Sequence, residues 1–102
     1  MADTASLPTA SQAAVSTPKA RSYLIQLCKH FAHKIPAAFA DNKGRIEFDS
    51  GVCELNADDE NALLLAVSTP SADKLGALED VVDRHLKRFA FKEELNIAWV
   101  RG

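Results

Sequence analysis

The chain has few of the residue types and patterns that mark an active site. Its only cysteines, Cys28 and Cys53, show no close pairing motif, so we expect reduced thiols and not a disulfide framework. The four glycines are widely scattered, which excludes a Gly-rich phosphate-binding loop, and no Gly-x-Ser-x-Gly elbow occurs. No apolar run approaches the roughly 20 residues that a membrane-spanning helix needs. The amino terminus also lacks the basic start and apolar run of a secretory signal, so a cytoplasmic protein is expected.

An excess of charge of either sign is also missing. Twelve basic residues face fourteen acidic ones, which leaves a formal charge of −2 at pH 7. Nucleic-acid binding usually needs a strongly basic surface, so this balance argues against a nucleic-acid partner. The 102 residues are 47 % hydrophobic and 25 % charged, values that are ordinary for one globular domain with a modest core.

Two helices are predicted from capping residues and apolar spacing. Residues 1–16 are mostly small or polar, and we expect them to form a disordered amino-terminal tail. A first helix should begin at Thr17-Pro18 and end at Pro36, and a second should run from Thr69-Pro70 to about Arg88. Each has one apolar stripe at helical spacing: Ala20, Leu24, Leu27, Cys28, Phe31 and Ile35 in the first, and Leu75, Leu78, Val82, Leu86 and Phe89 in the second.

Short alternating segments between and after the helices predict strands. They cover residues 37–41, 45–48, 52–55, 62–67 and 95–99, and polar turns separate the first four. The connections are too short for parallel crossovers, so the strands should pair antiparallel. Residues 17–102 are therefore expected to form a single α+β domain. We predict an antiparallel sheet of four or five strands with two helices packed on one face, in the order α-β-β-β(-β)-α-β.

The three histidines, which all fall within the predicted helices, are the best candidates for chemistry. Imidazole binds metals and exchanges protons near neutral pH, and His30 and His33 are neighbours at helical spacing. His85 lies among apolar residues, where it is either a buried neutral side chain or the floor of a pocket between the helices. Nearby cations would attract an anion or simply complement the helix dipole. The candidate ligand-binding residues are His30, His33, Lys34, His85 and Arg88.

Several segments in order resemble one small bacterial family. They are Ser22-Tyr23-Leu24, residues 28–34, residues 44–48, residues 78–82, residues 85–91 and Trp99. The family is catalogued as domain of unknown function 2218, and the resemblance covers roughly residues 16–101. It carries no agreed catalytic residues. Some similar proteins join this domain to a siderophore-interacting, flavin-binding reductase module, which implies a link to iron metabolism and a flavin-dependent reductase partner.

Three functional hypotheses follow. The first is a non-catalytic accessory domain that binds a small anionic or metal-containing ligand, such as an iron chelate, at the five candidate residues. This hypothesis specifies no cofactor, and the domain is expected to fold without one. The second is a protein-protein interaction or homodimerisation module that uses Val52, Leu64 or Ala98 on the uncovered sheet face. The third, an enzyme, requires His85 in a deep pocket beside a second titratable group. The distance between His30 and His85 separates these hypotheses best.

Overall fold

A computed structural model describes residues 7–102 as a layer of two helices on one antiparallel sheet. This arrangement confirms the predicted α+β class, but the sheet has six strands and not four or five. The additional strand precedes the first helix. In chain order the elements are β1 (Ala10–Ser16), α1 (Ala20–Phe31), β2 (Ala37–Ala40), β3 (Lys43–Phe48), β4 (Gly51–Asn56), β5 (Ala62–Ser68), α2 (Leu75–Phe89) and β6 (Val100–Arg101).

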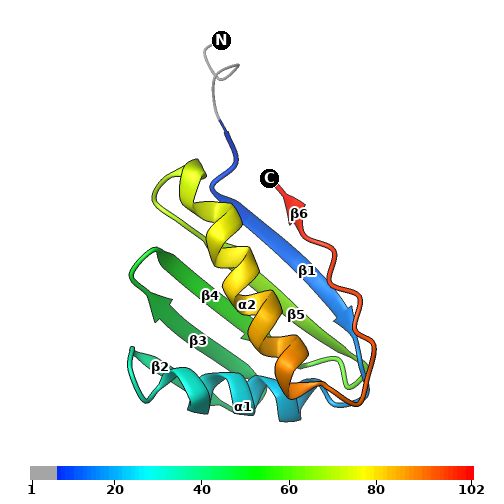
Figure 1. Ribbon diagram of the computed structural model, residues 1–102. Helices are drawn as coiled ribbons and strands as arrows, with labels where there is room; N and C mark the ends of the chain where they lie inside the picture. Colours follow the sequence, from blue (N-terminus) through cyan, green and yellow to red (C-terminus); the bar gives the residue numbers. More distant parts are fainter. Residues whose placement is uncertain (1–6) are drawn as a thin grey trace.

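The sheet has the strand order β2-β3-β4-β5-β1-β6, and every neighbouring pair is antiparallel. Strands β2 to β5 form a meander, as the short connections predict. Figure 1 shows α2 lying along the strands and α1 crossing one end of the sheet, both on the same face. The opposite face carries no helix. Within residues 7–102, no helix combines the length and apolar character needed to cross a membrane.

The core lies between the helices and the covered face of the sheet. Strand residues alternate between this core and the open face, so Cys53 and Leu55 are buried while Glu54 is exposed. The predicted helix stripes supply the other half of the core. Its largest fully buried side chains are Leu24, Leu27, Ile46, Leu55, Leu63, Leu65, Leu75, Leu78, Leu86, Val15, Val67 and Val82.

Helix α1 is shorter at both ends than the predicted segment from Thr17 to Pro36. The Thr17 hydroxyl accepts the N–H of Lys19 at 3.1 Å, which holds Thr17 in a turn before the helix begins. At the other end, the amides of Lys34 and Ile35 both donate to the Phe31 carbonyl, so the chain leaves the helix in tight turns. His33 therefore lies beyond the helix, and the prediction that all three histidines are helical was wrong for this residue.

Helix α2 begins after a short 3₁₀ turn, Ala72–Lys74, and ends close to the predicted residue. Two ion pairs stand on its outer face, Asp80 with Arg84 at 2.8 Å and Asp83 with Lys87 at 3.0 Å. Each joins an acid to a base four residues later, the orientation that supports a helix.

Residues 10–16 were predicted to lie in a disordered tail, and the structure corrects this. They form β1, which pairs with β5 along its whole length. The segment offered no visible apolar stripe because its buried side chains are small: Ala13, Val15 and Ser11. The hydroxyl of Ser11 is satisfied inside the fold by a hydrogen bond to Glu79 at 2.7 Å. The first six residues of the predicted tail lie outside the described part of the chain.

The final strand was predicted over residues 95–99, but β6 comprises only Val100–Arg101. Residues 95–99 do alternate as expected, and Leu95, Ile97 and Trp99 pack against the core. They belong to no strand of the sheet. Pairing with β1 begins at Val100, opposite Gln12. Burial alternation alone is therefore not enough to define a strand here.

Candidate functional site

The structure brings His30 and His85 together where α1 meets α2. Their ring centroids are 5.2 Å apart, with the planes inclined at 46°. His30 lies in the last turn of α1 and is exposed, while His85 lies in the second half of α2 and is half-buried. Two residues separated by 55 positions in the sequence thus form one imidazole pair at the helix crossing.

Three aromatic side chains pack around the pair. Phe31 contacts His85 at 4.8 Å and His30 at 5.0 Å between centroids. Phe89 meets His30 edge-on at 5.5 Å, and Phe48 meets Phe31 edge-on at 4.9 Å. These are favourable aromatic geometries. The two imidazoles thus belong to one cluster of five aromatic rings.

The hydrogen bond of His85 leaves one ring nitrogen free to bind. Its Nδ1 lies 2.7 Å from the carbonyl oxygen of Val81, one helical turn earlier. A carbonyl oxygen only accepts, so Nδ1 carries the proton and the neutral ring has its lone pair on Nε2. Most metal-binding histidines donate one ring N–H to a carbonyl or carboxylate and bind through the other nitrogen. His85 has this arrangement.

His30 is held in the neutral form by its surroundings. Partial burial is the largest cause that lowers its pKa from the ordinary 6.5. Charge repulsion from the neighbouring basic groups His85, Arg88, His33 and Lys34 lowers the pKa of His30 further. The imidazole lone pair is therefore available at neutral pH. Arg88 and Lys34, which stand at the edge of the site, give this rim a positive potential that favours anions.

The other three predicted site residues stand at this rim and outside the ring cluster. Arg88 is exposed in the last turn of α2, and His33 and Lys34 are exposed in the turns after α1. None of them makes an aromatic contact with the imidazole pair. In the part of the chain that the structure describes, no group of three or more histidine, cysteine or acidic side chains could hold a metal ion. The protein can offer two imidazoles and a cationic rim, but not a complete coordination shell.

The cysteines take no part in this site. Both are free, as expected from the sequence, and both are buried. Burial raises the pKa of the Cys28 thiol, and it raises the pKa of Cys53 to about 12. Thiols in this state are poor nucleophiles and metal ligands, so they act as packing groups.

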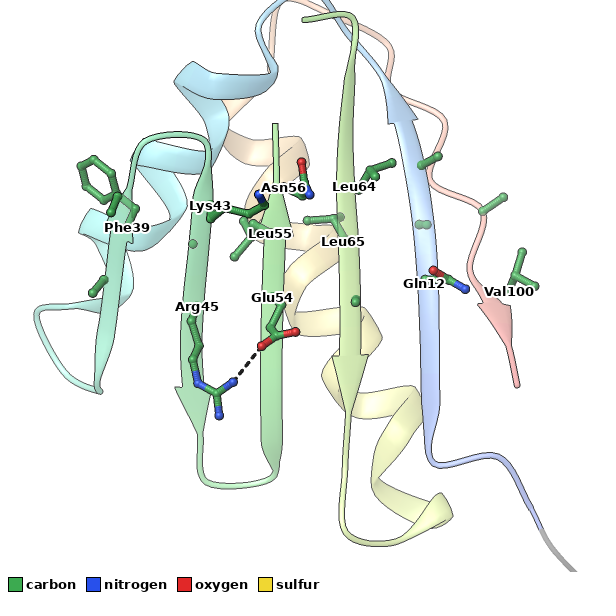
Figure 2. Close-up of a pocket in the computed structure, with 17 residues that line it drawn as sticks. Gln12, Phe39, Lys43, Arg45, Glu54, Leu55, Asn56, Leu64, Leu65 and Val100 are labelled. Carbon is green, nitrogen blue, oxygen red and sulfur yellow. Dashed lines mark hydrogen bonds and ion pairs between the residues drawn. The ribbon is translucent and has the colours of Figure 1, made fainter. Parts of the chain in front are cut away.

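A second feature lies on the open face of the sheet. Figure 2 views this face with the helices behind it, and residues from β1 to β6 line a shallow hollow of about 900 Å³. Leu64 and Val100 are its exposed large aliphatic side chains. Of the three open-face residues expected from the sequence, Leu64 and Ala98 line the hollow and Val52 does not. The contribution of β1 was not expected, because residues 10–16 were predicted to lie in a disordered tail. The hollow is also lined by Gln12, Ala14 and Ala66.

Fold and site together define a small α+β domain with a histidine pair at a helix crossing and an uncovered sheet. The chain belongs to the family described as "Uncharacterized protein conserved in bacteria (DUF2218)", whose model matches residues 12–100. It is also similar to the protein PA4090 from Pseudomonas aeruginosa, whose structure was determined by NMR. The two are 36 % identical, with a TM-score of 0.76, over 90 % of this chain and 95 % of PA4090. The comparison with curated proteins gave no match.

Proposed function

We propose that this domain is a non-catalytic binding module for a small anionic metal chelate, held at the helix crossing by His30 and His85. The observation that carries the proposal is the 5.2 Å separation of the two rings, with Nε2 of His85 free. Imidazole nitrogen suits zinc, copper, nickel and iron. Arg88 and Lys34 would attract the ligand electrostatically from the rim, whereas His33, which makes no aromatic contact with the imidazole pair, is assigned no part in binding.

A chelate fits this site better than a bare ion. Transition metals take four or more donors, and this site supplies two imidazoles. The remaining donors must come with the metal. Cations at the rim repel a bare divalent ion but attract a metal wrapped in carboxylates or other anionic groups. Iron carried by such a chelate is the candidate ligand, and a flavin-dependent reductase is the candidate partner that the family resemblance implies.

Binding also predicts a pH dependence. A metal displaces protons from its ligands, so both imidazoles must be neutral. The pKa of His30 lies below the ordinary 6.5, which keeps this ligand ready at neutral pH. Affinity should therefore fall as acid protonates the His30 ring, at a pH below that ordinary value.

Isothermal titration calorimetry with matched chelates tests the proposal. Ferric and zinc complexes of nitrilotriacetate are anionic or neutral and leave coordination positions open, whereas the corresponding ethylenediaminetetraacetate complexes leave few or none. We expect saturable binding of the nitrilotriacetate complexes only. His30→Gln or His85→Gln should weaken binding by at least about tenfold.

His33→Gln is the matched control, because His33 is a histidine close to the site without contact to the ring cluster. It should change the affinity by less than about threefold. Absence of binding in the wild-type chain would refute the proposal. Equal binding of the two chelate types would show electrostatic attraction without coordination, and it would also refute the imidazole contact.

A further inference from the structure

We infer that the open face of the sheet is the interface of a homodimer in which two copies pack face to face. This inference goes beyond the proposed ligand site, which lies among the helices on the other face. It rests on three properties of the face: its shape, its charge and its size.

The shape of the face is self-complementary. Leu64 projects from the first half of β5, a central strand of the sheet, with 43 % of its surface exposed. Its cross-strand neighbour on β1 is Ala14, and Ala66 is the next residue of β5 on the same face. A large side chain therefore stands beside two small ones in this hollow, whose charged lining residues lie on β3 and β4. In a two-fold dimer with its axis near this point, each Leu64 would fill the hollow of the other copy.

The charges of the face are already paired within the chain. Arg45 contacts Glu54 at 2.8 Å and Glu47 at 3.4 Å, and Lys43 contacts Asp58 at 3.0 Å (Figure 2 shows the first pair). The face thus has no cationic field of the kind that binds nucleic acid or an anionic membrane. A second copy can approach without like-charge repulsion, because the paired charges lie over β3 and β4 while the apolar half lies over β5, β1 and β6.

The size of the face is sufficient for a weak specific dimer. The six strands are two to seven residues long, and at about 3.3 Å per residue and about 4.8 Å between strands they present roughly 500 Å² of projected area. Two such faces bury on the order of 1,000 Å² or more, which is the lower limit for a specific interface. Sheets that pack face to face normally do so about 10 Å apart, and small alanine side chains permit this approach.

Sedimentation velocity of the full chain tests the inference between about 5 µM and about 500 µM, the range for a weak interface. We expect the mass to rise from 11.1 kDa towards twice that value. Leu64→Glu places two carboxylates at the centre of the interface and should weaken the dimer by at least about tenfold. Ala14→Glu, in the neighbouring hollow, is a second disrupting variant that leaves Leu64 intact.

Phe91→Glu is the matched control, since Phe91 is 77 % exposed and is not among the residues lining the face. This variant should dimerise like the wild type, and circular dichroism checks that all variants fold. A wild-type chain that stays monomeric at the highest concentration overturns the inference, even if the face then binds a hydrophobic dye or lipid vesicles. Dimerisation that survives both Leu64→Glu and Ala14→Glu overturns it as well. Neither result bears on chelate binding at the histidines.

Discussion

Substitution of Arg101 by alanine should destabilise the domain far more than the loss of an ordinary surface ion pair. Arg101 on β6 makes two hydrogen bonds to Glu79 on α2. Its Nη2 donates to Oε1 at 2.8 Å, and its Nε donates to Oε2 at 3.1 Å. The hydroxyl of Ser11 on β1 supplies a third hydrogen bond to the same carboxylate. Three elements that are distant in the sequence thus meet at one buried acid.

The size of the effect follows from the burial of Glu79. Its side chain is 10 % exposed, so Arg101→Ala would leave a nearly buried carboxylate with one of its three hydrogen bonds. Removing the partner of a fully buried charge lowers the free energy of unfolding by about 3–5 kcal/mol. The Arg101 side chain is 47 % exposed, so water can take part of its place in the variant. We therefore expect a loss of about 2–3 kcal/mol in the free energy of unfolding, or about 8–20 °C in Tm.

Arg84→Ala is the matched control. Arg84 makes a bond of the same length to Asp80, at 2.8 Å, but both side chains are 63 % exposed. Its loss should cost no more than about 0.5 kcal/mol. Urea unfolding followed by circular dichroism measures both variants.

Acid should remove the difference between Arg101→Ala and the wild type. The hydrogen bond from Arg101 is the largest cause that lowers the pKa of Glu79 below 4.5. A lowered pKa stabilises the fold above 4.5, and this contribution is lost as the pH falls through the pKa of the folded state. The destabilisation by Arg101→Ala should thus shrink as the pH falls from 5 to 3. Equal small losses for Arg101→Ala and Arg84→Ala at pH 7, or a difference that persists in acid, would refute this reasoning.

Two further predictions concern the α1 side of the core. A Cβ on Gly44 would stand 2.7 Å from Cys28 Sγ. Gly44→Ala should therefore cost about 1–3 kcal/mol in urea unfolding, and adding Cys28→Ala should recover part of it; purely additive losses would argue against this contact. Tyr23 donates a hydrogen bond to Glu93, and burial first, then Glu93, raises its pKa to about 12. As Tyr23 is the sole tyrosine, ultraviolet absorbance should titrate near that value, and stability should fall from pH 10 upwards, because only the unfolded state loses the proton there; a midpoint near 10 would be inconsistent with the buried contact.

The central part of the fold could be predicted from the sequence because its signals are local. The stripes of the two helices and the meander from β2 to β5 depend on spacing and turn residues that are visible in the chain. The meeting of His30 and His85 could not be predicted in the same way, because it depends on how the two helices cross. Their distance was the quantity that the sequence left open, and it is short.

The ends of the chain could not be predicted, because tertiary contacts decide their structure. Residues 10–16 become a strand through pairing with β5 and through the contact of Ser11 with Glu79, neither of which has a local signature. Residues 95–99 alternate because they line the core, yet only Val100–Arg101 pair with β1. Similarly, His33 leaves the helix because the turns after Phe31 end it before Pro36.

The most direct test of the proposed function is a titration of the histidine side-chain nitrogens by NMR with zinc nitrilotriacetate at neutral pH. If the helix crossing is the binding site, the ring signals of His30 and His85 shift together and saturate at one equivalent, with the larger change at Nε2 of His85. The signals of His33 should move little. Shifts confined to His33, or no saturable shift at His30 and His85, would contradict the proposal that these two imidazoles bind the chelate.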